Sequence, residues 1–433
     1  MEKRFVRVDT KESTPPPMLV GSTTSGFVFA IDLASGDELW ATWAANETAG
    51  VKGAVACKGG VVVAATNRCV DRYCYRYRNQ TYPLTPGNQY VRGLSAVDGT
   101  ALWEFKTFQP VWNMVPLWGQ GTSVFFQDWE GRVYCLDYVT GNQIFRVGGD
   151  IGTHSHAHAV YDPGHNVVVA LGVKHYTAGR CNPYPAPGIA PSRGTWPGTE
   201  GFIRGYNASS GRKLWDVSTP EPPASAAMGM LNSPEMHTRL VVTLGYNCYL
   251  GATSKIWGLD PNNGDLRWSI GGPTLWTNYC AGDKEGAEIR RAMGGRDKCS
   301  PNSWSMPAID ALGDVYIGSQ VGELQKLGSA NPGPAGSGAG HRVELLSTLT
   351  TGVAFQDAAI AFGQGVMAVS TCTSLIVFQS YAETFPQNGT WAVSRSQYPS
   401  SSDMVHGDDV AHTISEESYA GISVTPNIDS DDI

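Results

Sequence analysis

The chain has 433 residues and a formal net charge of −8. An acidic chain of this kind has no basic footprint for nucleic acid or an anionic membrane, so we expect neither as its main partner. No apolar run approaches the roughly 18–20 residues that cross a bilayer as a helix, so we expect no transmembrane segment. The first residues also lack the apolar core of a signal peptide.

Residues 1–17 are polar and end in three prolines, which favours an N-terminal tail. Beyond them one phrase recurs, as GFVFAIDLASGDELW at 26–40, GRVYCLDYVTGNQIF at 131–145 and GFIRGYNASSGRKLW at 201–215, with shorter copies at 94–103 and 256–268. Apolar residues alternate up to an Asp or Asn, a turn containing glycine follows, and a second strand ends on Trp or Phe. Each copy therefore predicts a β-hairpin with an aromatic anchor.

Two further strands are expected before most of these hairpins. They are 51–58 and 60–66 for the second hairpin, 114–118 and 123–128 for the third, 154–162 and 166–173 for the fourth, and 230–236 and 240–246 for the fifth. The first hairpin has only one such strand, at 18–22. A sixth unit covers 303–327, with its fourth strand displaced beyond 328–341, and a seventh covers 353–379, with a fourth strand at 390–394.

A repeated unit of four strands is typical of a β-propeller. We therefore predict an all-β fold in which residues 18–433 form one propeller of four-stranded antiparallel blades, seven by count with eight possible. Long loops are expected near 175–200, 328–341 and 395–418. The segment SVTPNID at 423–429 is similar to SMPAID at 305–310, so we predict that it supplies the missing strand of the first blade and closes the ring.

The repeated phrase resembles the PQQ-like repeat of the quinoprotein alcohol dehydrogenase-like β-propellers, over roughly residues 18–380. The resemblance implies one of two functions, because the family includes dehydrogenases that hold pyrroloquinoline quinone and Ca²⁺ in the central channel and propellers without a cofactor that act as scaffolds or sensors. The quinone enzymes carry an adjacent Cys-Cys pair beside the cofactor. This sequence has no such pair, so the resemblance does not favour pyrroloquinoline quinone here.

Three alternating histidines stand out, namely His154, His156 and His158. On a strand they would share one face, with neighbours about 6–7 Å apart, and imidazole suits Zn²⁺ and Cu²⁺. A metal site is one interpretation, and Ca²⁺ in the channel is a further possibility from the family. The alternative is a polar strand face turned toward a water-filled channel.

The first strands of the units also align on a common position. Two residues before it, polar side chains recur, and tryptophans fall in or next to the loops leading into these strands. We predict a ligand-contacting ring at the channel from these residues, which are His156, Asn232, Ser305, Gln356, Trp112, Trp276 and Trp304. The alternatives are that the polar residues border water and that the tryptophans plug the funnel.

The chain has nine cysteines. The spacings of Cys69 with Cys74 and of Cys280 with Cys299 suit local disulfides, which favours a secreted, periplasmic or organelle-lumen location. Three others, Cys57, Cys135 and Cys372, lie in apolar strands and are expected to be core thiols.

The leading functional hypothesis is a non-catalytic propeller that binds a protein partner or a small ligand at its central-channel face. The alternative is a channel-centred oxidoreductase, either quinoprotein-like or metal-dependent. A hydrolase or lyase built on the loops is a third option. No set of catalytic residues can be assigned from the sequence for any of them.

Overall fold

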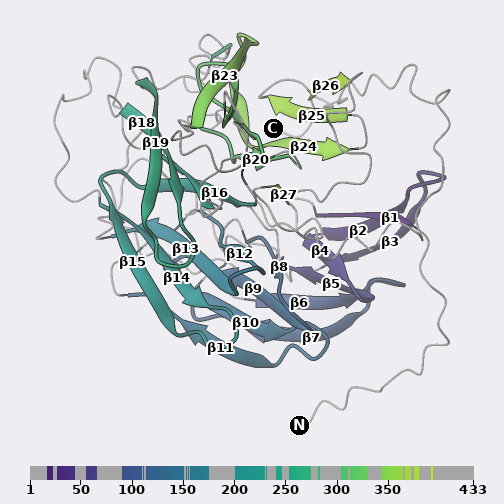
Figure 1. Ribbon diagram of the computed structural model, residues 1–433. Coiled ribbons are helices and arrows are strands. Elements are labelled where there is room, and N and C mark those ends of the chain that lie inside the picture. The colour runs from purple at the N-terminus through teal and green to yellow at the C-terminus, as the bar shows by residue number, and fades with distance from the viewer. Residues whose placement is uncertain are drawn as a thin grey trace, which may run out of the picture.

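The computed structural model consists of antiparallel β-sheet and connecting segments throughout the residues it describes (Figure 1). These residues are 17–22, 27–43, 55–65, 90–109, 111, 114–150, 153, 155, 157–174, 200–229, 231, 240–245, 253–274, 281–282, 304–310, 313–329, 343–363, 366–371, 375–379 and 392–393. None of them forms a helix that is long and apolar enough to cross a membrane.

The first four sheets follow the chain order. Sheet one consists of β1 (Met18–Ser22), β2 (Phe27–Asp32) and β3 (Glu38–Trp43). Sheet two consists of β4 (Val55–Lys58), β5 (Val61–Ala64), β6 (Tyr90–Ser95) and β7 (Ala101–Lys106). Sheet three consists of β8 (Leu117–Trp118), β9 (Ser123–Gln127), β10 (Val133–Asp137) and β11 (Gln143–Val147). Sheet four consists of β12 (Val160–Asp162), β13 (Val167–Val173), β14 (Gly201–Asn207) and β15 (Lys213–Thr219).

The remaining three sheets have four, five and three strands. Sheet five consists of β16 (Pro223–Met228), β17 (Leu240–Leu244), β18 (Thr253–Leu259) and β19 (Leu266–Thr274). Sheet six consists of β20 (Ala308–Ile309), β21 (Val315–Gly318), β22 (Glu323–Ser329) and β23 (Val343–Thr350), with β27 (Ala392–Val393) added beside β20. Sheet seven consists of β24 (Phe355–Gly363), β25 (Val366–Thr371) and β26 (Leu375–Gln379).

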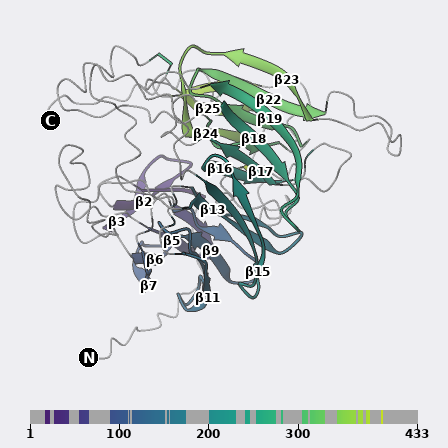
Figure 2. The same ribbon diagram turned by 90° about the vertical axis from the view of Figure 1, so that its left-hand side faces the viewer.

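The sheets are arranged around a common centre, with the first strands of sheets two to six innermost (Figures 1 and 2). These first strands approach one another, since β12 contacts both β8 and β16, and β16 contacts β20. The predicted all-β propeller fold is therefore confirmed, with seven sheets among the described residues. The predicted closing strand at 423–429 lies outside those residues, and closure of the ring stays a prediction.

The apolar cores lie between successive sheets. Alternate residues of a strand point to opposite faces, so Val62 packs toward Val28 of sheet one while Val63 packs toward Phe126 of sheet three. All four residues of β5 are buried for this reason. A sheet buried on both faces explains why its inner strands read as continuous apolar runs in the sequence.

The aromatic anchors join one sheet to the next. Trp103 on β7 lies opposite Gly93, where an added Cβ would come 2.2 Å from the ring. Its indole Nε1 donates a hydrogen bond of 2.8 Å to the carbonyl oxygen of Tyr138 in sheet three, and Gly141, at φ +74°, packs against the ring. The ring is thus held between a strand glycine of its own sheet and a turn glycine of the next.

The same contact recurs along the chain. Trp40 donates to the carbonyl of Ala96, at 3.0 Å, and Trp215 donates to that of Pro261, at 2.8 Å. The Phe145 side chain has no N–H donor, and its ring packs against Gly211 of sheet four. A positive φ and a bare Cα are both needed at these turn positions, and only glycine supplies both without strain.

Two strand predictions were wrong. The first strand of sheet five is β16, at 223–228, rather than 230–236, because its small residues pair with β17 from Pro223↔Leu244 to Met228↔Leu240. The strand expected near 390–394 does not complete sheet seven. It is β27, which pairs antiparallel with β20 of sheet six.

Candidate functional site

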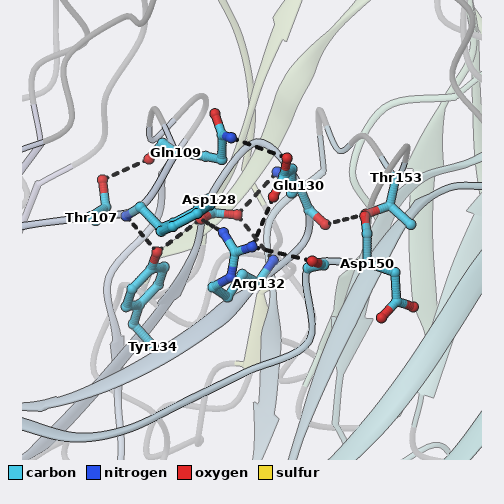
Figure 3. Close-up of polar contacts among 10 residues, drawn as sticks. Thr107, Gln109, Asp128, Glu130, Arg132, Tyr134, Asp150 and Thr153 are labelled. Atoms are coloured by element: carbon cyan, nitrogen blue, oxygen red, sulfur yellow. Dashed lines mark hydrogen bonds and ion pairs between the residues drawn. The ribbon is translucent and has the colours of Figure 1, made fainter.

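A polar network joins three loops at one end of sheets two and three (Figure 3). The loops are the segment after β7 (107–109), the turn between β9 and β10 (128–132) and the described residues after β11 (148–150, 153 and 155). The apolar runs of β9 and β10 are buried on both faces, and the network forms at the charged turn between them.

Asp128 lies at the centre of the network and is 1% exposed. It accepts hydrogen bonds from the Tyr134 hydroxyl at 2.9 Å and from Arg132 Nη1 at 2.8 Å. Its other oxygen accepts from the backbone N–H groups of Glu130 and Arg132, at 3.0 and 3.1 Å. Burial raises the pKa of Asp128 above its ordinary value, and the charge of Arg132 and the Tyr134 hydroxyl offset part of that rise.

Arg132 carries the network to the neighbouring loops. Its Nη2 pairs with Glu130 at 2.8 Å and donates to the carbonyl of Gly149 at 3.1 Å. The Thr153 hydroxyl also binds the carbonyl of Glu130, at 2.7 Å. One buried ion pair therefore fixes both the turn of sheet three and the loop that leads into sheet four.

Tyr134 connects the same carboxylate to the loop from sheet two. Its hydroxyl accepts a hydrogen bond of 2.8 Å from the backbone N–H of Phe108, while Gln109 Nε2 binds the Glu130 carboxylate at 3.0 Å. Burial and the charge of Asp128 raise the pKa of Tyr134, so the phenol stays protonated and donates to that carboxylate.

Phe108 is the side chain that this network presents to solvent. Its ring is 57% exposed, with the Arg132 guanidinium carbon 4.4 Å and that of Arg146 5.7 Å from the ring centre. Arg146, on β11, is exposed and is the cross-strand partner of Tyr134. We call these five residues, Phe108, Asp128, Arg132, Tyr134 and Arg146, the Phe108 platform.

The platform extends toward sheet four through a second arginine. Arg204 Nη2 lies 2.6 Å from Asp150, and its Nε lies 2.9 Å from Asp216. The guanidinium also stacks on Phe202, 4.3 Å from the ring centre. The loop that carries Asp150 is thereby tied to the strands on both sides of it.

Most of the predicted ring and metal residues cannot be placed. Five of them, together with the side chain of Gln356 on β24, lie outside the described residues, the five being His154, His156, Asn232, Trp112 and Trp276. The ligand-contacting ring therefore stays a prediction at these positions.

Two ring residues are described, and both are buried. Trp304 is 1% exposed and packs between sheets five and six, where an added Cβ on Gly272 would come 2.0 Å from its ring. The Ser305 hydroxyl accepts from the N–H of Gly318 at 2.9 Å and donates to the carbonyl of Met306 at 3.1 Å. In this arrangement both side chains make packing and backbone contacts.

His158 is buried and precedes its predicted strand, which begins only at Val160. The described part of the histidine segment therefore lacks the straight strand on which the predicted metal geometry rests. No group of three metal-ligating side chains is found in the part of the chain that the structure describes, which excludes His154 and His156.

Two of the cysteines predicted to be core thiols are described. Cys135 is buried on β10, as predicted, whereas Cys57 on β4 is exposed. That second prediction was wrong: Cys57 is exposed on β4, although its cross-strand partner Val62 is buried. Cys372 and the four cysteines of the predicted disulfides lie outside the described residues.

Sequence reasoning missed the platform, although one signal was present. The segment DWEGR at 128–132 places two acids and an arginine between the apolar strands β9 and β10. Charges enclosed between two buried strands indicate paired charges. The sequences of the loops after β7 and β11 show no pattern that identifies their residues as partners of this ion pair.

Comparison with protein families matches residues 87–290 to a model described as "Outer membrane protein assembly factor BamB". The chain therefore carries PQQ-like β-propeller repeats, as the hairpin phrase predicted. Curated protein sequences give no significant match.

Solved structures share the fold at low sequence identity. Quinohemoprotein alcohol dehydrogenase ADHIIG from Pseudomonas putida matches with a TM-score of 0.50 and 12% identity, over 84% of this chain and 63% of that one. BamB from Moraxella catarrhalis matches with a TM-score of 0.48 and 12% identity, over 84% and 79%. The C-terminal WD40 domain of Sif2 gives 0.45 and 12%, over 84% and 78%. This chain thus spans less than two thirds of the dehydrogenase.

Proposed function

We propose that this chain is a non-catalytic PQQ-like β-propeller that binds a protein partner at the Phe108 platform. The observation that carries the proposal is an exposed aromatic ring on a rigid, ion-paired base. Aromatic and arginine side chains dominate the binding free energy of protein interfaces, mainly where their conformation is fixed before binding.

The geometry supports a binding role for Phe108 in two ways. Its backbone N–H is held by Tyr134 and its ring rests on Arg132, so little conformational freedom is lost when a partner covers it. The charge of Arg132 beneath the ring is already paired, since Asp128 and Glu130 both bind Arg132. A partner that covers the ring therefore gains apolar contact while these ion pairs stay intact.

The family description supports the same class of function. The profile that matches 87–290 is described as an outer-membrane assembly factor, and an assembly factor acts through contacts with other proteins. We propose a location in a bacterial envelope on the same basis. Binding of a ligand at the central-channel face stays a separate prediction from the sequence.

Photo-crosslinking tests the proposal. A benzoylphenylalanine placed at Phe108 should crosslink to a specific envelope protein, whereas the same probe at Leu33, an exposed turn residue of sheet one, should not. The captured protein is then purified and titrated against wild type and Phe108→Ala. We expect the variant to bind it at least about tenfold more weakly. Equal crosslinking at both positions, or equal affinity of the variant, would overturn the proposal.

The oxidoreductase alternative is tested on the same protein. Incubation with pyrroloquinoline quinone and Ca²⁺, followed by alcohol- or sugar-dependent dye reduction, would establish it and remove the non-catalytic role. We expect no substrate-dependent reduction above that of the heat-denatured protein.

A further inference from the structure

Arg146 differs from the other arginines around it in what its charge meets. Arg132 and Arg204, on the same sheet and the next, each have a carboxylate oxygen within 2.8 Å. Among the described residues, the contact made by the Arg146 guanidinium is with the Phe108 ring. The platform therefore presents one exposed cation whose charge no described carboxylate compensates.

The position of Arg146 directs this charge toward a ligand on the platform. Arg146 and Tyr134 are cross-strand partners, so their side chains lie on the same face of sheet three. Its neighbours along the strand, Phe145 and Val147, pack against Gly211 of sheet four on the opposite face. The strand β11 is also the outer edge of its sheet among the described residues, which leaves room alongside it.

We infer that the Phe108 platform recognises an extended segment of its partner in which a carboxylate and a large apolar side chain stand two residues apart. The carboxylate pairs with Arg146, whose planar guanidinium suits bidentate contact, and the apolar side chain covers Phe108. This inference rests on the proposed function, because it names the chemistry of the partner at the same site.

The spacing comes from the geometry of the platform. The Arg146 guanidinium carbon lies 5.7 Å from the centre of the Phe108 ring. Alternate side chains of an extended strand are separated by about 6.6 Å and point to the same side. Adjacent side chains point to opposite sides, so a carboxylate and an apolar residue next to each other cannot reach both groups.

The overall charge of the chain limits how acidic the segment is. A net charge of −8 repels a partner that is acidic throughout. The negative charge is therefore confined to the residue that meets Arg146, and the rest of the segment is uncharged or apolar.

Short fluorescein-labelled peptides test this inference by anisotropy. Three probes share one composition frame and differ in their core, which reads Glu-Ser-Leu, Glu-Leu-Ser or Lys-Ser-Leu. Wild type should prefer the first core to the other two. Arg146→Glu should bind it roughly tenfold more weakly and gain affinity for the lysine core. Arg212→Glu, which reverses an exposed arginine on a turn of sheet four, is the matched control and should bind like wild type.

Each outcome separates the two proposals. Equal binding of the three probes by wild type, binding of none of them, or no change in Arg146→Glu would overturn the acidic-segment inference. Crosslinking at Phe108 would still stand in those cases, and only the partner chemistry would be wrong. Preferred binding of the Glu-Ser-Leu probe together with failed crosslinking would instead contradict the proposed protein partner.

Discussion

Sheets one to five differ from sheets six and seven in the residue that packs the outer strand against the next sheet. In the first five, an aromatic side chain occupies the cross-strand pair beside a bulge, and these residues are Trp40, Trp103, Phe145, Trp215 and Trp268. In sheet six the equivalent pair is Lys326↔Ser347, so a small polar residue takes the aromatic position. Sheet seven has no fourth strand among the described residues.

The two groups also differ in which side chains of the outer strands are exposed to solvent. Outer strand β23 of sheet six exposes Leu345, Leu346 and Leu349, and β26 of sheet seven exposes Leu375 at 67% and Val377 at 59%. Outer strands of the first group also expose apolar residues, such as Leu102 at 40% and Ile144 at 50%, but the anchor ring itself is covered, with Trp103 only 6% exposed. We call the contact between an anchor ring and the glycine turn of the next sheet the interlock. It needs both an aromatic residue in one sheet and a tight glycine turn in the sheet that follows.

Trp268 marks the boundary between the two groups. It lies opposite Gly258 like its counterparts, but its Nε1 is buried with no hydrogen-bond partner among the described residues. In sheet six the residues between β22 and β23, 330–342, lie outside the described residues.

Removing an interlocking ring should have the largest effect. Trp215→Ala empties the space between sheets four and five and deletes the bond to Pro261, so we expect a loss of about 3–5 kcal/mol in unfolding free energy. The control Leu345→Ala, on the exposed strand β23, should change it by less than about 0.5 kcal/mol. Guanidinium unfolding measures both, and similar losses would show that the interlock does not dominate.

Breaking the buried ion pair of the platform should come next. Asp128→Ala leaves Arg132 half-paired and the Tyr134 hydroxyl without its acceptor, so we expect a loss of about 3 kcal/mol. The matched pair in sheet six is Lys326 with Asp314, at 2.7 Å, and it is more exposed. Asp314→Ala should therefore lower the unfolding free energy by only about 1 kcal/mol. A larger loss for Asp314→Ala than for Asp128→Ala would contradict this order.

Filling a turn glycine tests the second half of the interlock. In Gly141→Ala the new Cβ meets Trp103 at 2.7 Å in a left-handed backbone, so we expect a loss of about 2 kcal/mol. Gly36 has a similar φ of +78° with open space around it, and Gly36→Ala should lose only the backbone share, about 1 kcal/mol. Thermal unfolding separates the two, and equal losses would mean that contact with the ring contributes nothing.

Replacing tryptophan by phenylalanine isolates the hydrogen bond. Trp215→Phe keeps a ring but loses the bond to Pro261, so we expect about 1 kcal/mol more destabilisation than in Trp268→Phe, whose N–H has no described acceptor. The comparison is read from the two unfolding free energies. A greater loss in Trp268→Phe would reveal an acceptor for its indole.

The smallest expected effect is on the pH dependence of stability. Hydrogen bonds from the Thr100 backbone, and from the Ser95 and Thr100 side chains, hold the pKa of Asp98 below its ordinary 3.8. A carboxylate with a lowered pKa contributes stability above its unfolded value, and that contribution disappears as the pH falls through the folded pKa. Asp98→Asn should therefore flatten the stability profile only below about pH 4. A change confined to neutral pH would contradict this sign.

The repeated hairpins could be predicted from the sequence because the residues that determine each hairpin are close together in the chain. Alternating apolar residues, a turn glycine and an aromatic anchor lie within fifteen residues, as in 26–40 and 201–215. The first strand of sheet five was misplaced because PASAAM at 223–228 has small residues in place of the β-branched ones that indicate a strand. The pairing of β27 with β20 joins segments more than eighty residues apart, and no local pattern encodes it.

The candidate site was harder to predict than the fold for the same physical reason. Phe108, Asp128 and Arg146 come from three loops or strands, and only the packing of sheet two on sheet three brings them together. The strand expected at 154–162 is shorter than predicted, since β12 begins only at Val160, and the metal site of His154, His156 and His158 stays a prediction. Residues that converge across sheets leave little trace in a single sequence.

Native-state hydrogen exchange tests the central claim most directly, namely that the aromatic interlock holds the middle sheets and the platform on them as one rigid body. The amides of β9, β10 and β13 should exchange at least about tenfold more slowly than those of β25, because the interlocked sheets open only with global unfolding. The N–H of Phe108, bound to Tyr134, should be protected with the first group. Equal protection of β9 and β25, with fast exchange at Phe108, would contradict the account.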